Sequence, residues 1–242
     1  MVSFVNILYN EVTMKELIGF VLLSGVKIFS HLFFRGEFFW PEPKPRDPFD
    51  VKLIVFLNHT SLYEPLYLQA APFSFLWKLT RHVHVPGADI TLNRPLVGRF
   101  WKMLFPRIST ITRKKDESWE LFLKQINSQS IIAIAPEGRM KRLNGLDKFG
   151  KKMTVRGGVA DIIERLGKGR MLICLSGGLH HVQTPGIMIP KLFKTIQMRF
   201  EVIEIEEYLQ SFSKEPKRRK LEIIQDLQRR LDEDCPPPLT RL

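Results

Sequence analysis

The sequence is poor in cysteine and in acidic residues, and each shortage narrows what the protein can be. Its 242 residues include two cysteines, Cys174 and Cys235, which belong to no CxxC or Cys/His pattern. Neither a disulfide framework nor a structural zinc site is expected, and a reducing cytoplasm is the simplest setting. Acidic residues number 25 against 37 Lys and Arg, a net charge of +12. This balance favours anionic partners, namely nucleic acid, anionic membranes or phosphate-bearing substrates, without choosing among them.

Long apolar runs are also scarce. The first residues carry no basic cluster and precede no small-residue cleavage site, so no cleavable signal peptide is expected. Residues 17–34 are strongly apolar, but Lys27 interrupts them, and the uninterrupted part is about half the roughly 20 residues of a clean spanning helix. We therefore expect residues 1–40 to form an apolar helical membrane-attachment segment that lies in one leaflet. A buried core helix is the alternative.

The rest of the chain alternates between strand and helix patterns. Residues 41–50 contain four prolines and are typical of an extended linker, so that residues 51–242 form one α/β domain. Strands are expected at 51–57, 82–85, 108–112, 130–135, 171–175 and 196–205, and helices at 65–79, 95–104, 115–127, 157–166 and 217–234. The alternation predicts a mostly parallel central sheet flanked by helices, ending in an amphipathic C-terminal helix.

Polar residues stand where three of these strands end. His59 follows the first strand, Arg113 follows the third, and Glu137 with Gly138 follows the fourth. Binding groups in open α/β sheets gather beyond the carboxyl ends of strands, so these residues could share one rim. Histidine is the usual general base near neutral pH, and the carboxylate of Glu64, five positions later, could orient it. Each pattern occurs often by chance, and their order is what makes them informative.

In this order the motifs resemble those of the glycerolipid acyltransferases of the 1-acylglycerol-3-phosphate acyltransferase type. That family has NHxSxxD after a strand, then a segment that ends in Arg, then a PEGTR turn. Here the corresponding residues are NHTSLYE from Asn58 to Glu64, PLVGRFWKMLFPRISTITR ending at Arg113, and APEGRMKR around Glu137. The resemblance covers roughly residues 51–190.

The resemblance implies direct acyl transfer from acyl-CoA or acyl-ACP to the hydroxyl of a lysophospholipid, with no cofactor and no metal. In that scheme His59 is the catalytic base and Glu64 orients it. The implied substrate-binding residues are Arg113, Glu137, Gly138 and Arg139, with Asn58 and Ser61 shaping the turn. The implied partners are membrane lipid and the thioester donor, not nucleic acid. The implied location is the cytoplasmic face of a membrane, as a monotopic or peripheral protein.

The sequence departs from the family pattern in three places, of which the altered third motif bears on the acceptor more than on the reaction. Glu64 stands where the family has Asp, which keeps the charge and adds one methylene. Arg139 and Met140 stand where the family has Thr-Arg, so the phosphate-binding cation could be Arg139 or Lys141. The family's fourth motif, a proline-rich strand end, is replaced by LSGGLHHVQTPG.

The residues leave other functions open. A non-catalytic lipid- or acyl-chain-binding protein on the same fold is one alternative. The aromatic and basic segment 93–107 could bind membrane or single-stranded nucleic acid. His82, His84, His180 and His181 could suggest a metal, but no carboxylate or cysteine spacing supports one.

Overall fold

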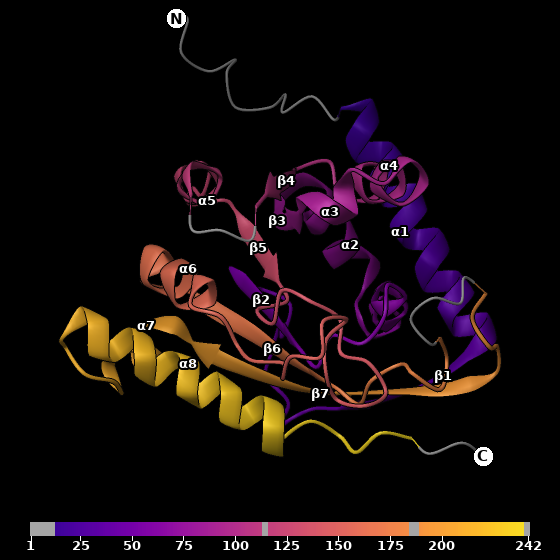
Figure 1. The fold of residues 1–242 in the computed structure, drawn as a ribbon. Helices are drawn as coiled ribbons and strands as arrows, with labels where there is room; N and C mark the ends of the chain where they lie inside the picture. Colours follow the sequence, from indigo (N-terminus) through magenta and orange to yellow (C-terminus); the bar gives the residue numbers. More distant parts are fainter. Residues whose placement is uncertain (1–12, 113–115, 184–188, 240–242) are drawn as a thin grey trace, which may run out of the picture.

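The computed structural model describes residues 13–112, 116–183 and 189–239, and these ranges form a seven-stranded sheet in the order β1-β7-β6-β2-β5-β3-β4 (Figure 1). The strands are β1 (Phe34–Phe39), β2 (Leu53–Leu57), β3 (Val83–Ala88), β4 (Ile108–Ile111), β5 (Ile131–Ile134), β6 (Arg170–Ser176) and β7 (Lys194–Glu204). Neighbouring strands from β6 to β4 are parallel. Strand β7 pairs antiparallel with β6 and parallel with β1. The predicted mostly parallel sheet is therefore confirmed.

Helices cover both faces of this sheet (Figure 1). They are α1 (Met14–Phe33), the 3-10 helix η1 (Glu64–Ala70), α2 (Phe73–His82), α3 (Asp89–Leu92), α4 (Pro95–Leu104), α5 (Glu117–Lys124), α6 (Gly158–Leu166), α7 (Ile205–Gln210) and α8 (Pro216–Glu233). Strand β2 shows how the layers form, because its side chains alternate between faces. Leu53, Val55 and Leu57 pack in the core under α5, α6 and α8, whereas Ile54 and Phe56 pack toward α1, η1 and α2.

The structure differs from the sequence interpretation in three places. Residues 34–39, expected within the helical N-terminal segment, form strand β1 of the central sheet. The helix expected at 65–79 is divided into η1 and α2, because Pro72 cannot continue a helix and biases Ala71 toward an extended backbone. The short helices α3 and α7 were not expected. The other predicted strands and helices are present, with ends shifted by a few residues.

Helix α1 turns a largely polar stripe toward the domain and apolar side chains outward. Its buried residues are Glu16, Gly19, Leu23, Lys27 and Ser30. Its exposed side chains include Met14, Leu17, Val21, Ile28 and Leu32. Within the described residues it is one helix that is long and apolar enough to cross a membrane by length and composition. The outer face of α1 therefore leaves apolar side chains exposed, a pattern typical of helices that contact lipid or another apolar surface.

Polar contacts fasten α1 to η1. Lys27 Nζ donates a hydrogen bond of 2.7 Å to the carbonyl oxygen of Gln69. Ser30 Oγ donates one of 2.8 Å to the carbonyl oxygen of Leu66, and the Gln69 amide donates back to the carbonyl oxygen of Ser30 at 3.0 Å. Buried polar groups need such partners. The apolar helix is thus joined directly to the segment that begins with Glu64.

Candidate functional site

Strand β2 ends in a turn that presents His59. Asn58 has a left-handed backbone, with φ +66°, a conformation that asparagine tolerates better than most residues. Its side-chain Nδ2 donates a hydrogen bond of 2.8 Å to the carbonyl oxygen of Ser176, at the end of β6. Because β2 and β6 are adjacent parallel strands, this bond joins two neighbouring strand ends and holds the turn at the edge of the sheet.

Glu64, the first residue of η1, holds both the imidazole and the turn. Its Oε2 lies 2.5 Å from Nδ1 of His59. Its Oε1 accepts hydrogen bonds from the backbone N–H groups of Thr60 and Ser61 at 2.8 Å and 3.3 Å. With Nδ1–H directed at the carboxylate, the lone pair of the neutral ring is on Nε2. The structure thus brings the two predicted catalytic residues together in the arrangement of a base and its orienting carboxylate.

The surrounding charges favour the protonated form of His59. Burial lowers the pKa of this imidazole, but the carboxylates of Glu64 and Glu137 outweigh burial, and the pKa is raised overall. A base with a raised pKa takes a proton from a hydroxyl more readily than ordinary histidine does. The ring is not sealed off, since 20% of the His59 side chain is exposed.

Glu137 supports the turn at residues 58–61, which we call the histidine turn. Its side chain is 1% exposed, and Oε1 accepts hydrogen bonds from the backbone N–H groups of Asn58 and His59 at 2.7 Å and 3.1 Å. Among the described residues, Oε2 has no partner. Burial raises the pKa of Glu137 to about 7, although the two N–H groups oppose the rise. Its contacts are therefore with the turn, whereas the sequence interpretation assigned it to substrate binding.

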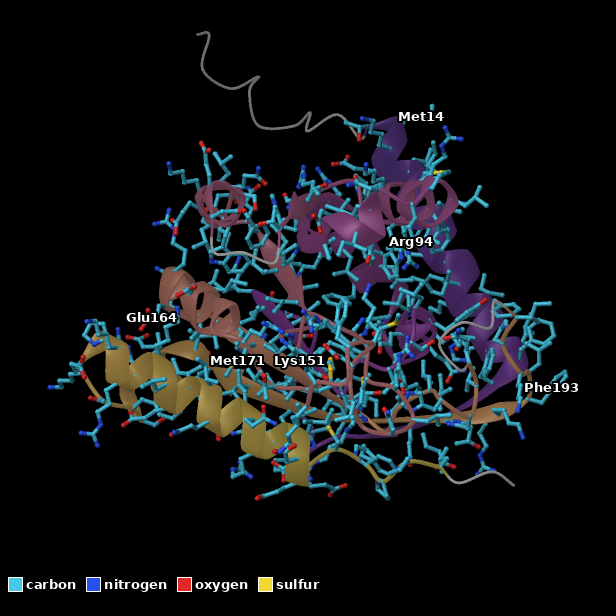
Figure 2. The ribbon with its side chains drawn as sticks, viewed as in Figure 1. Met14, Arg94, Lys151, Glu164, Met171 and Phe193 are labelled. Carbon is cyan, nitrogen blue, oxygen red and sulfur yellow. The ribbon has the colours of Figure 1, made fainter. Side chains whose placement is uncertain are left out.

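Arg139 forms an ion pair with a residue of the loop that follows it. Its guanidinium pairs with the carboxylate of Asp147, which is 4% exposed, and lies 4.8 Å from the ring centre of Phe149. Asp147 also accepts hydrogen bonds from the backbone N–H groups of Phe149 and Lys151 (labelled in Figure 2) at 2.8 Å and 2.9 Å. Burial opposes ionisation of Asp147, but these N–H groups and Arg139 outweigh it and hold the pKa at about 2. The charge of Arg139 is already compensated before any substrate arrives.

A cavity of about 1040 Å³ opens beside the histidine turn, and His59, Glu64, Gly138 and Arg139 are among its lining residues. Much of the lining is apolar and aromatic, including Phe56, Phe75, Trp101, Phe105 and Phe200. Another part is basic and includes Arg94, Arg142, Lys148, Arg156 and Lys220. A cavity of this size that combines an apolar and a cationic lining suits an amphiphile with an anionic end.

Arg156 and the start of α6 form one basic part of this lining. Arg156 Nε donates a hydrogen bond of 3.2 Å to the carbonyl oxygen of Glu137. Gly157 and Gly158 line the cavity at the helix start, where backbone N–H groups and the helix dipole favour anions. The sequence interpretation did not single out Arg156. A basic residue before a glycine pair that opens a helix was the signal that could have found it.

The segment that replaces the family's fourth motif holds the histidine turn from the side of β6. Leu179 N–H donates to Thr60 Oγ1 at 2.8 Å, and Ser61 Oγ donates to Gln183 Oε1 at 2.6 Å. The backbone of Lys141 joins the same region, since its N–H donates to the carbonyl oxygen of His59 at 2.7 Å. Residues 184–186, which complete the segment, lie outside the described residues.

The predicted site residues fall into three groups. His59, Glu64, Gly138 and Arg139 line the cavity. Asn58, Ser61 and Glu137 are absent from the described part of that lining and hold the turn instead. Arg113 lies outside the described residues.

Two of the other histidines, His180 and His181, bond to separate backbone groups. His180 Nε2 lies 2.7 Å from the carbonyl oxygen of Lys141, and His181 Nε2 lies 2.6 Å from that of Thr195. Within the part of the chain that the structure describes, no group of three or more His, Cys, Asp or Glu is placed to hold a metal ion.

This fold is similar to that of a known acyltransferase. The crystal structure of the 1-acyl-sn-glycerophosphate (LPA) acyltransferase PlsC from Thermotoga maritima matches with a TM-score of 0.52 and 15% sequence identity, over 92% of this chain and 85% of that chain. No family model matches the sequence, and no curated protein matches it. At this identity the likeness shows the fold, a mostly parallel sheet flanked by helices and preceded by an apolar helix. The chemistry must be argued from the site.

Proposed function

We propose that this protein is a membrane-associated acyltransferase that moves a fatty acyl group from a CoA or ACP thioester to the hydroxyl of a lysophospholipid of the 1-acylglycerol-3-phosphate type. The observation that carries the proposal is the His59–Glu64 pair, at 2.5 Å, on the wall of a cavity with apolar and basic linings. The fold likeness to PlsC is consistent with it.

The proposed reaction needs one base and no covalent acyl-enzyme. His59 Nε2 takes the proton of the acceptor hydroxyl while the hydroxyl oxygen attacks the thioester carbonyl carbon. The C–O bond forms, the C–S bond breaks, and the leaving thiolate takes the proton from the imidazolium. Glu64 stabilises that imidazolium and keeps Nδ1 directed away from the reacting atoms. Cys174 has no part in this scheme, and burial raises the pKa of its thiol far above neutrality.

Uncompensated cations support an acceptor that carries phosphate. Arg94, Arg142 and Arg156 line the cavity, and among the described residues none of them pairs with a carboxylate. Arg139 and Lys220 also line it, but Asp147 and Asp161 respectively neutralise them. We assign recognition of the acceptor phosphate to Arg142 and Arg156, because a guanidinium binds phosphate through paired hydrogen bonds.

The outer face of α1 supports membrane association. Val21 and Leu32 are 61% and 67% exposed, although the helix is strongly apolar. The polar stripe of α1 is bonded to η1, so the helix lies along the domain with one side free for lipid. We propose a monotopic or peripheral attachment at the cytoplasmic face, which would place a lysophospholipid within reach of the cavity.

The decisive experiment compares purified wild-type protein with His59→Ala on a panel of lysolipids and labelled acyl-CoA or acyl-ACP, read by mass spectrometry. His181→Ala is the matched control, because its ring bonds to the Thr195 carbonyl and lies outside the described cavity lining. We expect His59→Ala to lower turnover by about 10²–10⁴-fold with an unchanged melting temperature, and His181→Ala to retain most activity.

Two results would contradict the proposal. Wild-type turnover by His59→Ala on every active substrate pair would remove histidine base catalysis. Lipid that copurifies with wild-type protein, together with no thioester consumption on any pair, would favour a non-catalytic lipid-binding protein on the same fold.

A further inference from the structure

A second hollow lies between the start of α1 and the link from α3 to α4. It has a volume of about 760 Å³. Leu92, Arg94 and Ile108 line both this hollow and the large cavity, so the two adjoin. Figure 2 labels Met14, at the start of α1, and Arg94, at the start of α4, in the same part of the molecule. We call this hollow the basic groove.

The basic groove gathers positive charge without compensation. Lys15, Arg94, Arg99 and Lys102 line it, and its described lining contains no Asp or Glu. All four side chains are exposed, and among the described residues none of them forms an ion pair. The neighbouring Arg107, by contrast, pairs with Glu16 at 3.5 Å. Like charges held together repel each other, and a bound anion relieves this repulsion.

Apolar surface borders the groove on both helices. On α4, Leu96, Phe100 and Met103 stand three or four residues apart, so they share one face, and they are 79%, 43% and 46% exposed. On α1, Met14 and Ile18 are 70% and 39% exposed. Met103 and Ile18 also line the groove itself. Its ligand should therefore pair an anionic head with an apolar body, which nucleic acid does not.

We propose that the basic groove binds the phosphate headgroup of an anionic phospholipid in the membrane on which α1 lies. The proposal rests on the membrane association proposed above and adds a lipid site separate from the histidine turn. The bound lipid would have its chains against the exposed apolar faces of α1 and α4. Because the groove adjoins the large cavity, it would also fix that cavity's position relative to the membrane surface.

Binding to phosphatidylcholine vesicles, with and without phosphatidylglycerol, tests the groove. The test variant is R99Q/K102Q, which removes two charges without altering a residue assigned to the reaction. The matched control is K214Q/K217Q, which removes two exposed charges at and before the start of α8, on another side of the molecule (Figure 1). Acyl transfer in detergent and the melting temperature show whether each variant is folded.

We expect phosphatidylglycerol to strengthen binding of the wild-type protein and of K214Q/K217Q to a similar extent. For R99Q/K102Q we expect that gain to fall by roughly tenfold or more, since each basic side chain near an anionic surface contributes substantially to binding. Its binding to phosphatidylcholine alone and its turnover in detergent should remain. A pattern of this kind places the anionic-lipid contact in the groove.

Three other outcomes overturn the proposal. Equal losses in both double variants would mean that net charge, not the groove, attracts the membrane. A phosphatidylglycerol effect that is absent in the wild-type protein would remove the headgroup site while leaving membrane attachment through α1 intact. No binding of the wild-type protein to either vesicle would overturn both the groove and the proposed membrane association, yet turnover in detergent would still support the acyltransferase assignment.

Discussion

Glu64 bonds to the His59 ring through one carboxylate oxygen and to the backbone of the same turn through the other. Oε2 lies 2.5 Å from Nδ1 of His59, and Oε1 accepts the N–H groups of Thr60 and Ser61. The longer side chain of glutamate therefore fits at a position where the resembling family has aspartate. One residue thus holds both the ring and the turn. Two substitutions at Glu64, one that removes the charge and one that shortens the side chain, can therefore test charge and orientation separately.

Glu64→Gln should keep the fold and lose most of the activity. The amide oxygen can still accept the two backbone N–H groups, but the negative charge that stabilises the imidazolium is gone, so we expect turnover to fall by about 10²–10⁴-fold. Glu64→Asp restores the charge on a shorter side chain, and retained or improved turnover would support the orienting role. Steady-state kinetics with circular dichroism measure both variants. Full activity of Glu64→Gln would contradict the assigned role.

The pH profile of kcat/KM should depend on the His59–Glu64 pair. The general base works only when neutral, so the rate rises with pH through the pKa of His59, which the neighbouring carboxylates raise. Removing the charge of Glu64 leaves burial, which lowers that pKa, opposed only by the carboxylate of Glu137, so the pKa of His59 should fall. The acidic limb of Glu64→Gln should therefore move to lower pH, with a reduced plateau. Rates from about pH 5 to about pH 9 decide the matter, and a shift to higher pH would contradict the coupling.

The sequence predicts the strands and helices of this molecule better than its side-chain contacts. Apolar runs such as those of β2 and β5 are local patterns, and their polar ends identify His59 and Glu137 as neighbours at one sheet edge. Whether the Glu137 carboxylate faces outward to a ligand or inward to backbone N–H groups depends on packing between segments 78 residues apart. No periodicity carries that information.

Charge partners are equally hard to predict from sequence. Arg139 appears as a free cation in the altered PEGRM turn, but its loop returns Asp147 to it eight positions later. Helix α1 shows the same limit. Its composition predicts an apolar helix, whereas only the structure shows that Lys27 and Ser30 face inward and bond to η1. Composition sets what a segment is made of, and tertiary contacts decide which side of it meets the domain.

Glu137 should act on stability through two separable effects. Glu137→Leu removes the acceptor of two backbone N–H groups, and we expect a loss of about 2–4 kcal/mol in the free energy of unfolding. Glu137→Gln keeps an acceptor and cannot ionise. In the wild-type protein, burial raises the pKa of Glu137 from 4.5 to about 7, so the folded state holds a proton that the unfolded state releases.

The sign of the pH effect follows from this linkage. The raised pKa contributes stability that is complete below about pH 4.5 and is lost as the pH rises through about 7. Glu137→Gln lacks this loss. The unfolding free energy of the wild-type protein relative to Glu137→Gln should therefore fall between about pH 5 and about pH 8, as denaturant titrations can measure. A constant difference across this range would mean that Glu137 does not titrate there.

Arg142 should contribute to acceptor binding, and Arg139 to stability. Arg142 lines the cavity without a carboxylate partner among the described residues, whereas Arg139 is paired with the buried Asp147. Arg142→Gln should raise KM for a lysophosphatidic acid by roughly 10–100-fold, the contribution of a charge-assisted phosphate contact, with a smaller change in kcat. KM for an uncharged monoacylglycerol should not change. Arg218→Gln, at an exposed position on α8, is the control.

Removal of one partner of the buried pair should have a different effect. Asp147→Asn leaves the Arg139 charge uncompensated, so we expect a lower melting temperature and little selectivity between charged and uncharged acceptors. Replacing both residues with apolar ones should cost less stability than the single change does, because no buried charge is then left alone. An equal rise in KM for both acceptors in Arg142→Gln would contradict phosphate recognition by Arg142. A change in KM for the phosphate-bearing acceptor alone in Asp147→Asn would assign phosphate recognition to Arg139 instead.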